Sequence, residues 1–291
     1  ELSSEEIEDL KRSEDLETLE KIAHYASQLE TPKVDADAAL ESFKARNHAN
    51  RKTKVRTLNF KTFFRVAAVL VILLSAAYFF FFNNTIAFET QIAQTKTVTL
   101  PDHSEVTLNA ASKLTFNEKK WSEKRDLTLE GEAFFKVKKG QTFSVHTATG
   151  IVKVLGTHFN VKERKNYFEV NCYEGLVSVT YNNKTVKLPP GKTFRVINGA
   201  IENIEDFNAK NPSWIQQESS FKSIPLEQVI AELERQYDIK IKTEGVDTSK
   251  LFTGSFTHTN EQTALQAVTI PLKLSYRIQG KTIIFYNYDV K

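Results

Sequence analysis

The longest apolar stretch of the chain covers residues 66–82 and contains no charged residue. Extended back to Phe63, with Arg65 reaching toward the headgroups, a helix over this stretch approaches the roughly 30 Å of a hydrocarbon core. The pattern therefore predicts one transmembrane helix at 66–82. A buried helix of a soluble protein is rarely so long without polar residues, and a cleaved signal peptide would not begin some sixty residues into the chain.

The residues before this stretch indicate its orientation. The segment 43–65 is a basic juxtamembrane stem without acidic residues, and the next basic residue after the apolar run is Lys96. The positive-inside rule then predicts a cytoplasmic N-terminus and an exported C-terminal part. A basic stem beside a membrane is most simply an orientation and anionic-lipid signal, and the acidic segment 1–42 argues against direct contact with nucleic acid.

The acidic segment 1–42 is predicted to be helical. Ser3 and Glu6 have the spacing of a capping box, and Pro32 is expected to end the first helix. A second helical stretch is expected from about Asp35. Apolar residues recur at intervals of three and four for much of the first helix: Ile7, Leu10, Leu16, Leu19, Ile22, Ala26 and Leu29. This apolar stripe either meets a partner or packs within a small helical bundle.

Residues 88–205 change to short alternating segments separated by turn signals such as Asn182-Asn183 and Asn198-Gly199. About a dozen strands with no helix between them predict an all-β domain, either a sandwich or a β-solenoid. The stretch 83–94 before them is polar and has no clear pattern, so it is expected to be unstructured and open to a protease.

After a polar linker at 208–212, residues 218–287 alternate between strand and helix patterns. The order β-α-β-β-α-β-β predicts a small α+β domain with two helices on one side of a short sheet. The fold class is therefore mixed, with a helical N-terminal segment, one membrane helix, an all-β domain and this α+β domain. The single cysteine, Cys172, is interpreted as a small buried hydrophobe, since one cysteine cannot form an intramolecular disulfide.

Side chains that could perform catalysis do not form a recognisable set. The six histidines lack metal-ligand spacing, and phosphate-loop, dinucleotide-binding and nucleophile-elbow motifs are absent. Glu130 and Glu132 could be imagined as the paired carboxylates of a glycosidase, but they are expected to point to one solvated face. The sequence therefore predicts no enzyme, no metal site and no cofactor.

Three motifs in order resemble the FecR-like anti-sigma factors in the form found in Bacteroidetes-type bacteria: LPDHSEVTLNAAS at 100–112, LEGEAFFKV at 129–137 and VKVLGTHFNV at 152–161. The segment 221–241, with FTGSF at 252–256 and ALQAV at 264–268, resembles the appended domain of this family, which is similar to the secretin and TonB short N-terminal module. One departure is His103, where the family usually has Gly; His tolerates a tight turn better than a β-branched residue would, so the turn should survive.

The resemblance implies a relay across the cell envelope with the inner membrane as its location. An outer-membrane TonB-dependent transporter would contact the periplasmic part through its signalling domain, and the cytoplasmic segment would bind an extracytoplasmic-function sigma factor. The alternative is a membrane-anchored periplasmic protein that binds or scaffolds envelope polysaccharide or protein assemblies. Deletion of residues 1–42 should affect transcription only in the first case.

Two contact surfaces are hypothesised within this relay. The sigma factor would bind the apolar stripe of the first helix through Leu16, Leu19, Ile22, Ala26 and Leu29. The signalling domain of the transporter would add a strand to the edge of the segment 251–257. The residues expected at this edge are Leu251, Thr253, Ser255 and Thr257.

Overall fold

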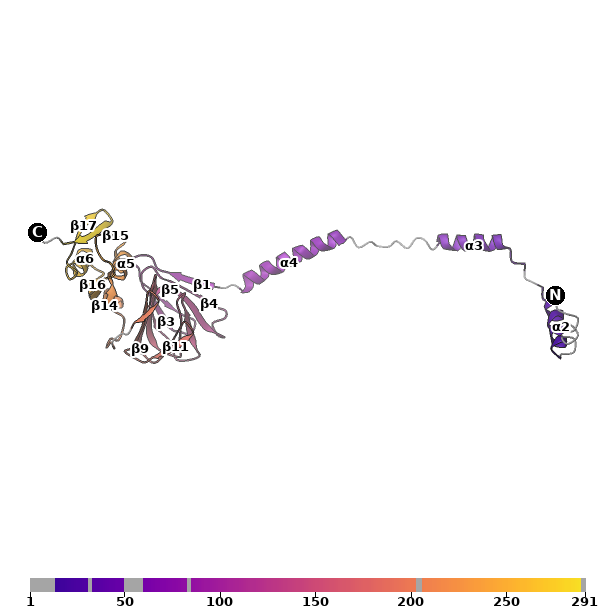
Figure 1. Ribbon diagram of the computed structural model, residues 1–291, viewed down its shortest axis with the longest axis horizontal. Helices are drawn as coiled ribbons and strands as arrows, with labels where there is room; N and C mark the ends of the chain where they lie inside the picture. Colours follow the sequence, from indigo (N-terminus) through magenta and orange to yellow (C-terminus); the bar gives the residue numbers. More distant parts are fainter. Residues whose placement is uncertain (1–13, 31–32, 50–59, 83–84, 203–205, 289–291) are drawn as a thin grey trace, which may run out of the picture. The chain divides into compact units, whose positions relative to one another are not determined.

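The computed structural model describes residues 14–30, 33–49, 60–82, 85–202 and 206–288 (Figure 1). The chain divides into two units, residues 1–70 and 71–291. Within the described helices, the side chains of residues 14–16, 49, 60, 62 and 76–82 are not described.

In the described residues of the N-terminal segment, two helices are formed: α2 (Glu14–Ser27) and α3 (Ala36–Ala49). The second confirms the helical stretch that was expected from about Asp35. Asp35 caps α3, because its Oδ1 accepts hydrogen bonds of 3.1 Å from the backbone N–H groups of Asp37 and Ala38. The predicted capping box at Ser3 and the predicted stop at Pro32 lie outside the described residues.

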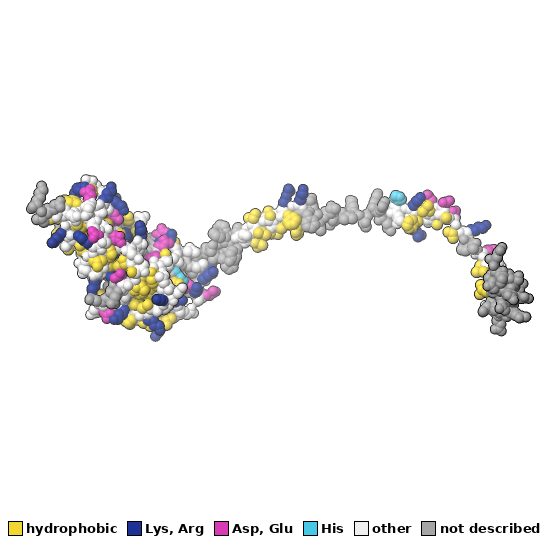
Figure 2. Space-filling model, viewed as in Figure 1, with side chains coloured by type: hydrophobic (Ala, Val, Ile, Leu, Met, Phe, Trp, Pro, Cys, Tyr) yellow, Lys and Arg dark blue, Asp and Glu magenta, His cyan; other side chains and the backbone are white. Residues whose placement is uncertain are grey.

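The helix α4 (Phe60–Phe82) is continuous over the apolar run. Hydrophobic side chains cover its described surface (Figure 2), and residues such as Leu70 and Ile72 are more than half exposed. In the described part of the chain, no helix is both long enough and apolar enough to cross a membrane. The membrane span at 66–82 is therefore not confirmed and stays a prediction.

In the described residues, thirteen strands, β1 to β13, form one curled sheet. The strands are β1 (Thr85–Glu89), β2 (Lys96–Thr99), β3 (Glu105–Leu108), β4 (Lys113–Asn117), β5 (Arg125–Lys136), β6 (Phe143–His146), β7 (Ile151–Val154), β8 (His158–Arg164), β9 (Tyr167–Glu174), β10 (Val177–Tyr181), β11 (Lys184–Leu188), β12 (Thr193–Ile197) and β13 (Ala200–Glu202). The prediction of an all-β domain is confirmed, and β5 is the longest of these strands.

The strand β5 belongs to both halves of the curled sheet. Its first part pairs with β4 and β6, and its second part, from Gly131, pairs with β3 and β8. Side chains from both halves meet in one core that includes Leu114, Phe135 and Val161, each fully buried. Nearly all the described pairings of this sheet are antiparallel. Of the two architectures left open by the sequence, the arrangement is therefore that of a sandwich, because a solenoid would stack parallel strands.

Gly131 lies where β5 passes from one half of the sheet to the other. Its φ is 107°, and a Cβ there would lie 2.5 Å from Ser112 Oγ and 2.8 Å from Ser112 Cα. Both the backbone angle and the crowding therefore favour glycine. The turn at His103 also forms as expected, with φ 62°.

We expect Gly131→Ala to lower the free energy of unfolding by about 2–4 kcal/mol, because it adds a backbone strain and a steric clash. Urea unfolding measures the change. The matched control is Gly199→Ala, whose φ is 82° but whose Cβ would meet nothing within 4 Å. Equal losses for the two variants would mean that the clash with Ser112 contributes nothing.

The C-terminal residues form a separate α+β arrangement with its own core, in which Leu226, Phe252 and Phe285 are buried. Its elements are β14 (Glu218–Pro225), α5 (Leu226–Tyr237), β15 (Lys240–Glu244), β16 (Leu251–Thr257), α6 (Glu261–Thr269), β17 (Leu274–Gln279) and β18 (Thr282–Asn287). This is the predicted order β-α-β-β-α-β-β. A short 3-10 helix, η1 (Ser213–Gln216), precedes it.

The expected single short sheet is wrong, because the strands form two sheets. β14 pairs with β16, whereas β15 pairs in parallel with β18, which also pairs with β17. The reason is that β15 takes β18 as its partner instead of its sequence neighbour β16.

Candidate functional site

The predicted sigma-factor stripe is exposed where its side chains are described. Leu19 is 56% exposed and Ile22 58% exposed on α2, and Ala26 is also exposed. Leu16 lies on α2, but its side chain is outside the described residues. Leu29 does not lie on the helix as expected, since α2 ends at Ser27 and the chain then tightens, with Leu29 N–H bonded to Ala26 O at 3.2 Å.

The predicted transporter contact lies on β16, which is an edge strand paired only with β14 in the described residues. Leu251, Thr253 and Ser255 are exposed, and Thr257 is half-buried. The alternate positions point inward, where Phe252 and Phe256 are each 2% exposed. The strand has no second strand partner in the described residues, although Thr257 O accepts a hydrogen bond from Tyr237 Oη, and its inner face anchors it to the domain.

The edge of β16 differs from the other edges in its lack of charge. Every other edge strand in the described residues carries at least one charged residue, which is a common protection against unwanted strand pairing. The sequence of β16, LFTGSFT, has neither a charge nor a proline. This contrast could have been found from the sequence once the edges were known.

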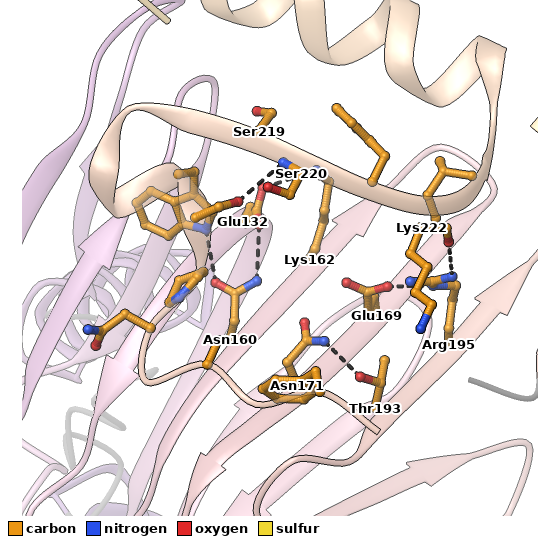
Figure 3. Close-up of a pocket in the computed structure, with 18 of the residues that line it drawn as sticks. Glu132, Asn160, Lys162, Glu169, Asn171, Thr193, Arg195, Ser219, Ser220 and Lys222 are labelled. Atoms are coloured by element: carbon orange, nitrogen blue, oxygen red, sulfur yellow. Dashed lines mark hydrogen bonds and ion pairs between the residues drawn. The ribbon is translucent and has the colours of Figure 1, made fainter. Parts of the chain in front are cut away.

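A third site, which the sequence did not indicate, lies where the C-terminal arrangement covers one half of the curled sheet. A cavity of about 490 Å³ is lined by β5, β8, β9 and β12 on one side and by residues 206–228 on the other (Figure 3). Trp214 from η1 is buried there, and its Nε1 donates a hydrogen bond of 3.2 Å to Asn160 Oδ1.

Glu132 on β5 is the centre of a hydrogen-bonded cluster beside this cavity. Its two carboxylate oxygens accept bonds from Asn109 Nδ2 at 2.9 Å and Asn160 Nδ2 at 3.0 Å, and Lys162 Nζ lies 3.3 Å away. Glu132 is only 3% exposed, so the expectation that it shares a solvated face with Glu130 is wrong. Glu132 does lie on the outer face of β5, as the alternation predicted, but residues 206–228 and α5 cover that face.

The cluster continues into α5 through Glu232, which is fully buried. Glu232 Oε2 lies 2.9 Å from Lys162 Nζ and 2.8 Å from Arg235 Nη2, and Oε1 accepts a bond of 2.9 Å from Gln236 Nε2. Burial opposes the charge of Glu232, but Lys162, Arg235 and Arg164 outweigh it and hold the pKa of this carboxyl well below 4.5. We call Glu132, Lys162, Glu232, Arg235 and Gln236, with Asn109, the interdomain network.

A second buried ion pair lies on the same face of the sheet. Arg195 Nε on β12 donates to Glu169 Oε2 at 2.5 Å, and Tyr167 Oη donates to the same oxygen at 2.7 Å. Arg195 Nη1 also donates to Lys222 O of β14 at 3.1 Å. Burial, reinforced by the charge of Glu169, raises the pKa of Tyr167 well above its usual value, so this phenol stays a hydrogen-bond donor.

The stretch 83–94 is not the open segment that was expected. Residues 83–84 lie outside the described residues, but 85–89 form β1, which pairs with β4 along its whole length. The turn that follows is bonded on both sides, since Thr90 N–H donates to Ser112 O at 2.9 Å and Ala93 N–H to Arg235 O at 2.8 Å. The polar residues at 85–94 belong to a strand and a turn that are hydrogen-bonded to their neighbours.

Cys172 is buried as expected, and burial raises the pKa of its thiol to about 11, so it is neutral and unreactive at ordinary pH. Four charged side chains that line the cavity form two ion pairs, Lys162 with Glu132 and Arg195 with Glu169. Among the described residues, the apolar side chains of α2 and the outward residues of β16 are exposed. These are the features of a regulatory protein that works by binding.

Comparisons with known proteins agree with this class. The family described as FecR protein matches residues 87–178, and the one described as FecR, C-terminal matches residues 218–285. Two crystal structures described as an anti-sigma factor from Parabacteroides distasonis, at 1.65 and 2.50 Å resolution, are similar to the chain with 28% identity and TM-scores of 0.64 and 0.65. Each comparison covers 70% of this chain and 100% of the chain in the crystal structure. The search of curated proteins gave no significant match.

The chain belongs to the FecR-like anti-sigma factors, which are regulatory and not enzymatic. A sigma factor is the partner that this membership implies.

Proposed function

We propose that the protein is a single-pass anti-sigma factor of the inner membrane that relays a signal from an outer-membrane TonB-dependent transporter to an extracytoplasmic-function sigma factor. The observation that carries the proposal is the combination, in one chain, of the FecR domain and its C-terminal partner with an uncharged run at 66–82 and an acidic helical segment before it.

The membrane topology rests on the sequence around α4. The apolar run is preceded by the basic stem 43–65, and α4 is one uninterrupted helix over the run. Segment 1–42 would then be cytoplasmic, and the curled sheet and the C-terminal arrangement would lie in the periplasm. The exposed apolar side chains of α4 in Figure 2 are consistent with a lipid environment.

The cytoplasmic output would be carried by α2. Leu16, Leu19, Ile22 and Ala26 recur on one face, and Leu29 follows just beyond the helix, so a groove on the sigma factor could bury this stripe. The acidic residues around it would speed the encounter with a basic surface, while the stripe would supply affinity. No cofactor takes part in this mechanism.

The periplasmic input would be received by the edge of β16. We expect Ser255→Pro to weaken binding of the transporter's signalling domain by at least about tenfold, because proline removes a backbone donor and stiffens the edge. Pull-down or calorimetry with the isolated signalling domain measures the effect. Ser255→Ala is the matched control, since it keeps the backbone N–H, and it should bind like the original chain.

A Ser255→Pro variant that unfolds at the same urea concentration as the original chain and binds equally well would exclude β16 as the contact.

The test of the whole proposal is co-purification of the full chain with the sigma factor encoded nearest to its gene, with deletion of residues 1–42 as the control. Binding that requires these residues supports the anti-sigma output. Absence of binding to any sigma factor, with transcription unaffected by the deletion, would favour the envelope scaffold instead.

A further inference from the structure

The helix α5 contacts the chain at the point where the curled sheet begins. Arg235 O accepts a hydrogen bond of 2.8 Å from the backbone N–H of Ala93, and Gln236 Nε2 donates to Asn109 Oδ1 at 3.1 Å. Ala93 lies in the turn after β1, and β1 begins three residues after the end of α4. The last turn of α5 is therefore bonded to the turn that follows β1.

The turn at 90–94 is also hydrogen-bonded to the loop before β4. Thr90 Oγ1 donates to Asn109 O at 2.6 Å and accepts from Ser112 N–H at 3.0 Å, and Ala111 N–H donates to Gln91 O at 3.1 Å. Asn109 thus joins three partners: the turn at 90–94, Glu132 of the sheet and Gln236 of α5. A displacement of α5 would remove its hydrogen bond to Ala93 in the turn and its hydrogen bond to Asn109 in the loop at the same time.

The contact between α5 and the outer face of the sheet includes a group of ion pairs. Lys162 forms ion pairs with both Glu132 of β5 and Glu232 of α5. Arg235 forms a second ion pair with Glu232. Ion pairs buried in this way contribute little net free energy but strongly favour one geometry, because each charge needs all its partners. The core of the C-terminal arrangement includes Tyr167 and Ile197 of the sheet, but its other members come from residues 221–285. The core of the curled sheet contains residues of the sheet and its loops, so each side keeps a core of its own if the contact opens.

We propose that α5 is a latch: docked through the interdomain network, it fixes the turn at 90–94 and β1, and undocked it releases them. This rests on the proposed function, in which the C-terminal arrangement receives a periplasmic signal and α4 leads to the cytoplasm. A partner that binds the undocked form more tightly than the docked form would shift the equilibrium toward release. The strand β14, which pairs with β16 and contacts Arg195 through Lys222 O, connects the proposed input edge to the same interface.

The test is hydrogen–deuterium exchange on the full chain, comparing Glu232→Gln and Gln236→Met with the original. Gln236→Met keeps the length of the side chain and all the charges but removes the bonds to Asn109 Oδ1 and Glu232 Oε1. We expect exchange of the Ala93 and Ala111 amides to become at least about tenfold faster in both variants, with β9 unchanged. Glu244→Gln is the control, because it removes a carboxylate from an exposed pair with Arg277 in the same domain.

Faster exchange confined to the C-terminal elements, with Ala93 as protected as in the original chain, would overturn the latch. If Glu232→Gln unfolds the C-terminal arrangement, α6 and β18 will lose protection, and Gln236→Met then decides. The measurement uses neither a sigma factor nor a transporter, so the latch can fail while the proposed function stands, and the reverse.

Discussion

Glu232→Ala is expected to lower the free energy of unfolding of the C-terminal arrangement by about 3 kcal/mol, because it leaves buried positive charge without its partner. Glu232 is fully buried, and its carboxylate is shared by Lys162 and Arg235 at 2.9 and 2.8 Å. Lys162 keeps Glu132 as a second partner, at 3.3 Å, whereas Arg235 loses the only carboxylate to which its side chain is bonded in the described residues. Loss of α5 docking should accompany the loss of stability.

Urea unfolding followed by tryptophan fluorescence measures this effect, since Trp214 lies at the interface and Trp121 lies in the core of the curled sheet. Glu244→Ala is the control and should cost at most about 1 kcal/mol, because its pair with Arg277 is exposed. The pKa of Glu232 is below that of a free glutamate, so its contribution is present above pH 4.5 and is lost as the pH falls through the folded-state value. A loss similar to the control would mean that Arg235 and Lys162 tolerate the removal of the Glu232 carboxylate without a penalty.

The double variant Leu19→Glu, Ile22→Glu is expected to abolish co-purification with the sigma factor. The two side chains are 56% and 58% exposed on α2, so the substitution adds charge to the proposed interface without disturbing a core. Burying two carboxylates against an apolar groove would cost several kcal/mol, which is a large fraction of a micromolar binding energy. Co-purification from cells that express both proteins measures the effect.

The control is His24→Glu, Gln28→Glu, which adds two carboxylates at positions outside the stripe. These two side chains contact each other at 3.0 Å and are both exposed. The control should retain binding, which would separate the position of the new charges from their number. Retained binding by the Leu19 and Ile22 variant would reject α2 as the interface.

Alternation of apolar and polar residues was enough to predict the strands and the α+β order. In β16, for example, Phe252 and Phe256 are buried and Thr253 and Ser255 exposed, as a period of two requires. Strand pairing was harder, because the choice of β18 by β15 depends on contacts distant in the sequence. The same limit made 83–94 look open, since a strand as short as β1 needs β4 to be recognised.

The site at the interface could not be predicted for a related reason. Glu132, Lys162 and Glu232 are ordinary surface residues by pattern, and they lie 30 to 100 positions apart in the chain. Their burial follows only from the contact of α5 with the outer face of the curled sheet. Lys162, whose side chain is 17% exposed, lies between two carboxylates only in the assembled molecule.

The strand β5 also determines when the curled sheet can be completed during synthesis. Its partners β3 and β4 precede it in the chain, and its partners β6 and β8 follow it. A nascent chain that ends before Arg164 therefore has an unpaired edge at the centre of its future core. Closure must wait until that residue has emerged from the ribosome, and until then the central strand has an unpaired edge of the kind that favours aggregation.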